Sequence, residues 1–141
     1  MTLFLLDTSA VLAHAFSEPG QEELIDLLGG GEALIAAPSI PEFAARLRAL
    51  GNSRDRVETA WRAYRAMFAE VVAIDENVAR LAWTLREEAQ ERIPLVDALI
   101  ASAALVRGAT LVHRDPHFES LPEGRPARRW LARDPARNSM D

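Results

Sequence analysis

The feature that most restricts the fold of this chain is an alternation of short apolar runs with longer segments of helical periodicity. Apolar runs closed by acids, proline or turn residues predict buried strands, and these lie at 2–6, 33–37, 71–74 and 110–113, with one more short strand expected at 128–131. Helical spacing of apolar residues predicts helices at 9–16, 21–28, 39–50, 54–68, 76–91 and 94–107. Apolar strands that alternate with helices are typical of a parallel sheet covered on both faces. The sequence therefore predicts an α/β fold with a central four- or five-stranded parallel sheet flanked by helices.

Length and composition indicate one domain. The 141 residues suffice for a single hydrophobic core, and 49% of them are hydrophobic, as in globular chains. We expect the domain to span 1–132, followed by a flexible tail at 133–141. The chain has no cysteine, which excludes disulfides and thiolate metal sites. The apolar start at 1–6 is too short to cross a membrane and has no basic lead-in. We therefore expect a cytoplasmic protein with no signal peptide and no membrane partner.

Four acidic residues occupy the positions at which such a sheet binds ligands. Asp7 follows the first predicted strand and Asp115 follows the fourth, while Glu42 lies in the first turn of the helix after the second strand. Asp97 lies near the start of the helix at 94–107. Ligands of open parallel sheets bind beyond the carboxyl ends of the strands. The sequence therefore predicts that these four carboxylates converge at one edge of the sheet.

Converging carboxylates repel one another and raise each other's pKa, so a cluster that stays ionised at neutral pH needs a cation. Oxygen ligands select Mg²⁺ or Mn²⁺, and such an ion can activate water and stabilise a leaving oxygen in phosphodiester hydrolysis. The formal net charge of −5 argues against a nucleic-acid partner, but a bound cation inverts the field of an acidic site. This combination of groups indicates metal-dependent cleavage of a phosphodiester.

The basic residues, all 16 of them arginine, provide candidate contacts for an RNA backbone. One cluster surrounds the junction of two predicted helices and contains Arg46, Arg48, Arg54 and Arg56. A second cluster lies at 125–129. Solvated helix faces are the simpler explanation for both clusters, and the sequence leaves this alternative open.

Each acid also has a purely structural explanation. Asp7 can cap the following helix, and Asp115 can belong to a turn with Pro116. Glu42 follows Ser39 by three residues, which matches a capping box as well as it matches a metal ligand. Asp97 is harder to explain in this way, because its helix is apolar on nearly every face and a buried carboxylate needs a partner.

Four sequence motifs, in this order and spacing, resemble those of PIN-domain proteins, in particular the VapC toxins of bacterial toxin–antitoxin pairs. The motifs are LLDTS at 5–9, PSIPE at 38–42, LVDALIASA at 95–103 and TLVHRDPHF at 110–118. The resemblance covers the chain to about residue 131. It implies an endoribonuclease that depends on Mg²⁺ or Mn²⁺, forms a homodimer and is held inactive by a cognate VapB-like antitoxin.

The resemblance also implies roles for individual residues. It carries Asp7, Glu42, Asp97 and Asp115 over as an acidic quartet that binds metal and performs catalysis. It places the hydroxyl of Thr8 or Ser9 near the metal.

Two histidines depart from the family pattern. His113 stands where the family commonly has Thr or Ser, and His117 stands where a second acid before Phe118 is frequent. Their spacing matches no zinc pattern, so the sequence favours contact with substrate or a proton over metal ligation. We include His113 among the residues expected near the site.

Two apolar stripes on predicted helices can either pack in the core or line a groove that binds a partner. Val57, Trp61, Tyr64 and Phe68 share one helix face, and residues 24–28 form a shorter stripe on another helix. Burial in the core is the simpler interpretation, and a groove for an antitoxin helix is the alternative.

The sequence argues against two other function classes and is compatible with a third. A phosphoacceptor signalling domain requires a lysine, which this chain lacks, and a haloacid-dehalogenase-type phosphatase requires a second aspartate where Ser9 stands. A non-catalytic interaction module of the same fold stays open as the alternative to a nuclease.

Overall fold

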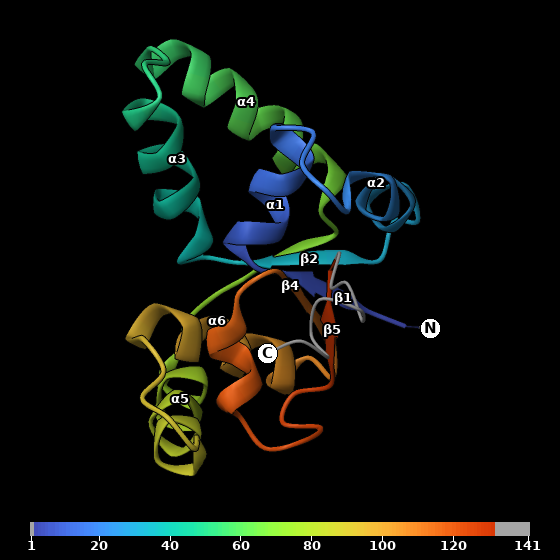
Figure 1. The fold of residues 1–141 in the computed structure, drawn as a ribbon. Coiled ribbons are helices and arrows are strands. Elements are labelled where there is room, and N and C mark those ends of the chain that lie inside the picture. Colours follow the sequence, from blue (N-terminus) through green and yellow to red (C-terminus); the bar gives the residue numbers. More distant parts are fainter. Residues whose placement is uncertain (1, 132–141) are drawn as a thin grey trace, which may run out of the picture.

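Five strands form one parallel sheet at the centre of the computed structural model, which describes residues 2–131 (Figure 1). Their order across the sheet is β3-β2-β1-β4-β5, and every neighbouring pair is parallel. The strands are β1 (Phe4–Leu6), β2 (Ala33–Ala36), β3 (Glu70–Val72), β4 (Thr110–His113) and β5 (Arg128–Trp130). The predicted α/β fold with a parallel sheet is therefore confirmed, with five strands. The tail expected at 133–141 lies outside the described residues.

Helices cover both faces of this sheet, as Figure 1 shows. One face carries α1 (Thr8–Ala15), α2 (Gln21–Gly29), α3 (Ser39–Ala49) and α4 (Arg54–Met67). The other face carries α5 (Glu76–Glu88), α6 (Leu95–Val106) and the short 3₁₀ helix η1 (Pro116–Ser120). In the described part of the chain, no helix is long and apolar enough to cross a bilayer.

The strands bury both of their faces, which divides the core in two. Leu5 packs among the residues of α5 and α6, whereas the next residue, Leu6, packs among those of α1 to α4. The same alternation holds for Leu111 and Val112 in β4, because successive side chains of a strand point to opposite faces. The continuous apolar runs of the sequence therefore have a direct structural cause.

The apolar stripes on the helices mainly serve this core. Val57, Tyr64 and Phe68 are buried, and the ring of Trp61 lies 6.4 Å from that of Phe43. In α2, Leu24 and Leu28 are buried. The core interpretation of both stripes is confirmed for these residues. Ile25 is the exception, with 52% of its surface exposed.

Parallel pairing also fixes where the loops gather. The carboxyl ends of β1, β2 and β4 lie at the same edge of the sheet, and α1, α3 and η1 begin within three residues of these ends. Asp75, which follows β3, caps α5 by accepting a hydrogen bond from the backbone N–H of Val78, as its sequence context indicates. The edge at β1, β2 and β4 is where the candidate acids meet.

Candidate active site

Two of the four acids and one histidine form a compact cluster at this edge. The Nδ1 atom of His117 lies 3.1 Å from Asp115 Oδ1 and 3.2 Å from Asp97 Oδ2. One ligand atom from each residue falls within 4.8 Å of the others. Asp97 comes from the first turn of α6 and Asp115 caps η1, so the cluster joins segments about twenty residues apart.

Asp7 is the most buried of the acids, with 3% of its surface exposed. It caps α1 by accepting a hydrogen bond from the backbone N–H of Ala10 at 2.9 Å, so the expected cap exists. The pKa of Asp7 is raised to about 7, mainly by burial. The charges of Asp97 and Asp115 add to this increase, and the hydrogen bonds from Ala10 and Ser9 oppose it. A helix cap needs no such burial. Capping alone therefore does not explain this carboxylate.

Glu42 is held by a residue of another helix. The hydroxyl of Thr8 donates a hydrogen bond to Glu42 Oε1 at 2.6 Å, and Ser39 Oγ lies 3.0 Å from the same hydroxyl. The capping-box alternative is wrong, because α3 already begins at Ser39 and no side chain caps it. Glu42 instead contributes to the charge that raises the pKa of Asp97. Its carboxylate therefore belongs to the same electrostatic group as the other acids.

Ser9 links Asp7 to the loop after β4. Its hydroxyl lies 2.8 Å from both carboxylate oxygens of Asp7 and accepts a hydrogen bond from the backbone N–H of Arg114 at 3.0 Å. Thr8 and Ser9 thus each orient one acid, Glu42 and Asp7 respectively.

His113 is completely buried, so it does not line the site but contacts residues next to it. Its Nδ1 accepts a hydrogen bond from the backbone N–H of Asp115 at 3.2 Å, and its Nε2 lies 2.9 Å from Glu119 Oε2. Burial lowers the pKa of His113. Because Nδ1 accepts from a backbone donor, Nε2 carries the proton of the neutral ring and donates to Glu119. His113 therefore holds the backbone of Asp115 in place.

The donor set fits a divalent cation. Burial raises the pKa of Asp97, as do the charges of Asp115 and Glu42, while the hydrogen bond from His117 lowers it. Together with the influence of Asp97 and Asp115 on Asp7, these effects connect all four acids. Carboxylates that raise one another's pKa in this way are stabilised as anions by a positive charge among them. The compact cluster therefore contains Asp97, Asp115 and His117, a residue that sequence reasoning placed outside the ligand set. Asp7 and Glu42 are linked to it through their electrostatic influence.

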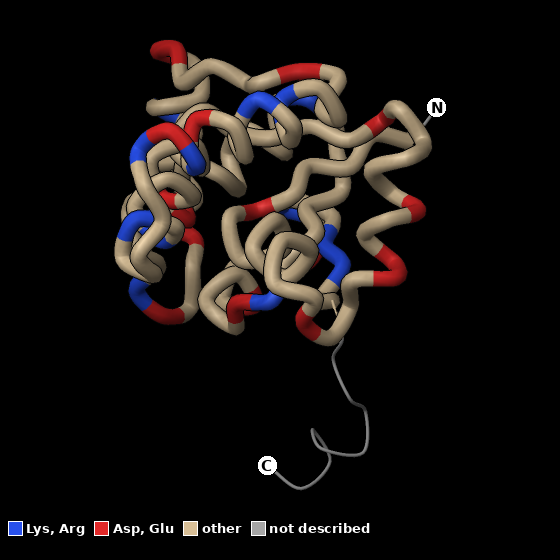
Figure 2. Tube along the Cα trace, turned by 90° about the horizontal axis from the view of Figure 1, so that it is seen from above, with Lys and Arg blue, Asp and Glu red and all other residues tan. Residues whose placement is uncertain are grey.

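The arginines predicted to contact RNA lie at different distances from this cluster. Arg46 lines a hollow of about 350 Å³ that also includes Ser9 and Arg114. Arg48 donates to the backbone carbonyl of Asn52, and Arg54 and Arg56 lie in the first turn of α4, at the outer end of the α3–α4 hairpin (Figure 1). In Figure 2 basic and acidic positions are interspersed rather than separated. Arg46 is therefore the member of its cluster beside the acids.

The second arginine cluster is paired within the protein. Arg125 makes two hydrogen bonds to Glu88, Arg128 binds Glu119 and neighbouring carbonyls, and Arg129 pairs with Glu23. These partners favour a structural role for the cluster.

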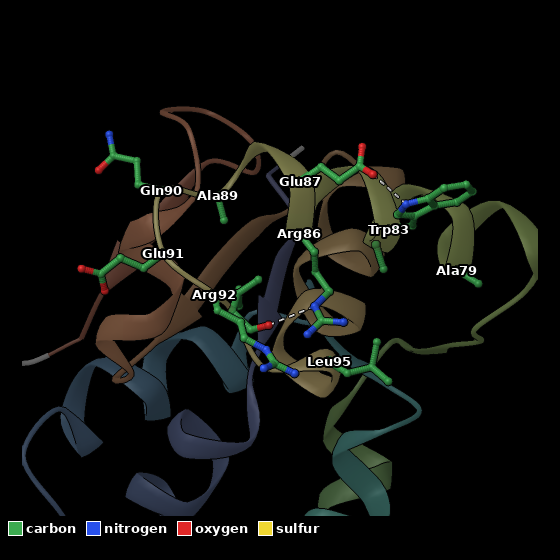
Figure 3. A pocket seen from close by; sticks show the side chains of 11 residues that line it. Ala79, Trp83, Arg86, Glu87, Ala89, Gln90, Glu91, Arg92 and Leu95 are labelled. Carbon is green, nitrogen blue, oxygen red and sulfur yellow. Dashed lines mark hydrogen bonds between the residues drawn. The ribbon is translucent and has the colours of Figure 1, made fainter.

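A second hollow, of about 510 Å³, lies between α5 and the loop that leads to α6 (Figure 3). Two of its lining residues are large, exposed apolar side chains: Trp83 is 64% exposed and Leu95 is 56% exposed. Its rim carries Arg86, Glu87 and further charged residues of both signs. None of the four acids lines it, so this hollow is a separate surface feature.

Comparisons with known proteins agree with this arrangement. A family model described as PIN domain matches residues 4–124. The structure resembles VapBC2 from Rickettsia felis bound to a promoter DNA fragment, with a TM-score of 0.75, 17% identity and coverage of 92% of this chain and 99% of that chain. It also resembles DNA-bound VapBC from Salmonella typhimurium, with a TM-score of 0.71, 20% identity and coverage of 86% and 94%. For FitAcB from Neisseria gonorrhoeae the TM-score is 0.69, the identity 20% and the coverage 92% and 98%. No curated protein sequence matches the chain.

Proposed function

This chain belongs to the PIN domain family, and on that premise we propose that it is a metal-dependent endoribonuclease, the toxin of a VapBC-type toxin–antitoxin pair that acts in the cytoplasm. The observation that carries the proposal is the convergence of Asp7, Glu42, Asp97 and Asp115 on one edge of the sheet, where they influence each other's ionisation. A site built only for stability gains nothing from such repulsion. Acids collected in this way are typical of functional sites.

The proposed roles begin with Asp7 and Asp97, the two acids that a purely structural role explains least well. Asp7 and Asp97 hold the principal metal, and Glu42 and Asp115 complete its shell or orient the attacking water. A bound Mg²⁺ or Mn²⁺ supplies an activated water and neutralises charge on the phosphate. Thr8 keeps Glu42 in place through a 2.6 Å hydrogen bond, while Ser9 does the same for Asp7. Such supporting contacts fix ligand orientation, on which hydrolysis depends.

The direct test is cleavage of a structured RNA by the purified chain with Mg²⁺, with Mn²⁺ and with a chelator. We expect cleavage with either ion and none with the chelator. Full activity in the chelator would refute the metal-dependent mechanism. No cleavage under any condition, from protein that binds metal and RNA, would favour the alternative of a non-catalytic interaction module.

Arg46 is the proposed contact for the RNA backbone, because it lines the hollow that reaches Ser9 beside Asp7. We expect Arg46→Ala to weaken RNA binding several-fold and to reduce the slope of log K against log salt by about 0.7 to 1, the value of one phosphate contact. The turnover rate at saturating RNA stays unchanged. Fluorescence anisotropy of labelled RNA, in an Asp97→Asn background that prevents cleavage, measures the affinity and its salt slope.

The matched control for Arg46 is Arg80→Ala, which removes an exposed arginine from α5 on the opposite face of the sheet. Arg54→Ala and Arg56→Ala test the outer end of the same arginine cluster. If Arg46→Ala bound RNA with the salt slope of the wild type, Arg46 would not contact the RNA backbone.

If the chain is a toxin, its expression should arrest bacterial growth, and the arrest should require the acidic site. The similar structures named above include VapBC assemblies bound to DNA, and we propose a VapB-like antitoxin as the partner of this chain. Induced expression in a bacterial host should stop growth, whereas expression of Asp97→Asn should not. Co-expression of a candidate antitoxin should restore growth and form a complex with the wild-type chain. Normal growth with abundant, active wild-type protein would refute the toxin role.

The hollow beside α5 supports a homodimer. Trp83 and Leu95 expose apolar surface there, and the rim carries arginines and glutamates. A two-fold interface can place the arginines of one copy against the glutamates of the other. We expect a dimer by light scattering and a monomer for Trp83→Ala. The control is Ile25→Ala on α2, which removes an exposed apolar side chain from the other face. A monomeric wild type would refute this dimer.

A further inference from the structure

His117 occupies a position between two of the candidate metal ligands. Its Nδ1 lies 3.1 Å from Asp115 Oδ1 and 3.2 Å from Asp97 Oδ2. The side chain is 52% exposed, compared with 31% for Asp115 and 16% for Asp97. His117 therefore lies at the open side of the cluster, where an ion arriving from solvent meets it first.

The backbone around His117 is firmly held. The N–H of His117 donates to Asp115 Oδ1 at 2.9 Å, and its carbonyl accepts a hydrogen bond from the Ser120 hydroxyl at 2.7 Å. The next residue, Phe118, is completely buried against the ring of His113. The ring of His117 thus extends from an anchored 3₁₀ turn, which holds the start of its side chain next to Asp115.

The ring has no other evident task. Within residues 2–131, the hydrogen-bonding and ion-pair partners of its nitrogens are Asp97 and Asp115. A histidine used only to stabilise the turn does not need a ring nitrogen directed at two carboxylates. Two explanations are consistent with this position: the ring is a counter-charge for the acids, or it is a ligand that shares an ion with them.

Imidazole nitrogen changes which ion such a site prefers. Mg²⁺ demands oxygen ligands in near-ideal octahedral geometry, whereas first-row transition ions accept imidazole readily. Carboxylate ligands suit Mn²⁺ as well as Mg²⁺. A set of two aspartates and one imidazole is therefore a better match for Mn²⁺ than for Mg²⁺.

We propose that His117 is a metal ligand in this protein and that its imidazole makes the site prefer Mn²⁺, a first-row transition ion, over Mg²⁺. This inference rests on the metal site of the proposed function, but it concerns the choice of ion and needs no RNA. In this arrangement His117 adds a nitrogen ligand, beside Asp97 and Asp115, to the ion that Asp7 and Asp97 hold in the proposed function.

The test uses the whole chain and measures the binding of Mn²⁺ alone and Mg²⁺ alone by calorimetry. We expect tighter binding of Mn²⁺ to the wild type. His117→Ala should weaken Mn²⁺ binding by about tenfold or more, the size of effect typical for residues that support a metal site, and should change Mg²⁺ binding by less than about threefold. His117→Asp should strengthen Mg²⁺ binding relative to Mn²⁺. Electron spin-echo spectroscopy of bound Mn²⁺ should show coupling to a ¹⁴N nucleus that disappears in His117→Ala.

His14→Ala is the matched control, because it deletes another imidazole, one that binds Tyr64 instead of the acids. This variant should keep both affinities and the nitrogen signal. The unfolding temperature in chelator should be similar for all variants, which excludes misfolding as the cause of lost binding.

Several results would overturn the inference. If His117→Ala bound both ions more tightly, the imidazole would be a counter-charge that competes with metal. Equal losses for the two ions, or no nitrogen signal in the wild type, would also refute ligation. Selective Mn²⁺ binding without RNA cleavage would refute only the proposed nuclease function, and failure of the wild type to bind either ion would refute both.

Discussion

Replacing Asp97 with asparagine is expected to reduce RNA cleavage by about a hundredfold or more while the protein stays folded. Asp97 lies in the first turn of α6, is 16% exposed at its side chain and points at His117 and the other acids. Removing its charge removes a proposed ligand of the metal. Losses of this size are typical when a residue that fixes the metal or its charge is changed.

The same substitution should not weaken the fold in the absence of metal. Burial and the charges of Asp115 and Glu42 raise the pKa of Asp97, so the charged form is an unfavourable one in the folded state. Asparagine has the same shape and no charge. We expect the metal-free unfolding temperature of Asp97→Asn to equal or exceed that of the wild type, while the stabilisation by added Mn²⁺ or Mg²⁺ becomes smaller.

Asp75→Asn provides a matched control for this prediction. Asp75 also follows a strand and also caps a helix, through a 2.9 Å hydrogen bond from Val78, but it is not among the clustered acids. Cleavage rates with Mn²⁺ and unfolding temperatures with and without the ion are the measurements. Wild-type cleavage by Asp97→Asn, or an equal loss in Asp75→Asn, would contradict the role assigned to Asp97.

The sequence predicted the sheet and most helices because each element carries its own periodic pattern. The errors lie at the ends of elements: the strands expected at 2–6 and 71–74 are β1 (Phe4–Leu6) and β3 (Glu70–Val72), and the helix expected to reach 91 ends at Glu88. For the helix, tertiary contacts decide, because the N–H of Gln90 donates to the carbonyl of Ser120. Such long-range contacts leave no local signal.

In the candidate site, too, local sequence patterns predicted some features, whereas long-range contacts determined others. Asp7 and Asp115 were located by their positions at strand ends, which topology converts into proximity. The partner of Glu42 is Thr8, 34 residues away, and local spacing favoured Ser39 equally. His117 was assigned outside the ligand set because its spacing fits no zinc motif, yet the 3₁₀ turn after Asp115 brings its ring between two acids. Contacts made across the fold were therefore the part that sequence alone did not supply.

Asp7 should make the metal-free protein less stable as the pH rises from about 4 to about 7. The pKa of Asp7 increases from 3.8 to about 7 on folding, mainly through burial. Between these values the unfolded chain is ionised at this position and the folded chain is protonated. The unfolded state then binds fewer protons, so the free energy of unfolding falls with pH. A shift of about three units corresponds to roughly 4 kcal/mol at pH values above both pKa values.

Comparing the wild type with Asp7→Asn in chelator isolates the contribution of the Asp7 charge, including its repulsion by Asp97 and Asp115, because titrating groups that do not interact with Asp7 affect both proteins alike. Asparagine keeps an oxygen that accepts the hydrogen bond from Ala10 and cannot ionise. The variant should therefore be the more stable protein at pH 8, by on the order of 4 kcal/mol, and the difference should vanish near pH 4. Denaturant unfolding at the two pH values measures it. If the free energy of unfolding changed with pH in the same way for both proteins, a raised pKa at Asp7 would be contradicted. If added Mn²⁺ restored the stability of the wild type at pH 8 but did not stabilise the variant, the cation would compensate the charge buried at this position.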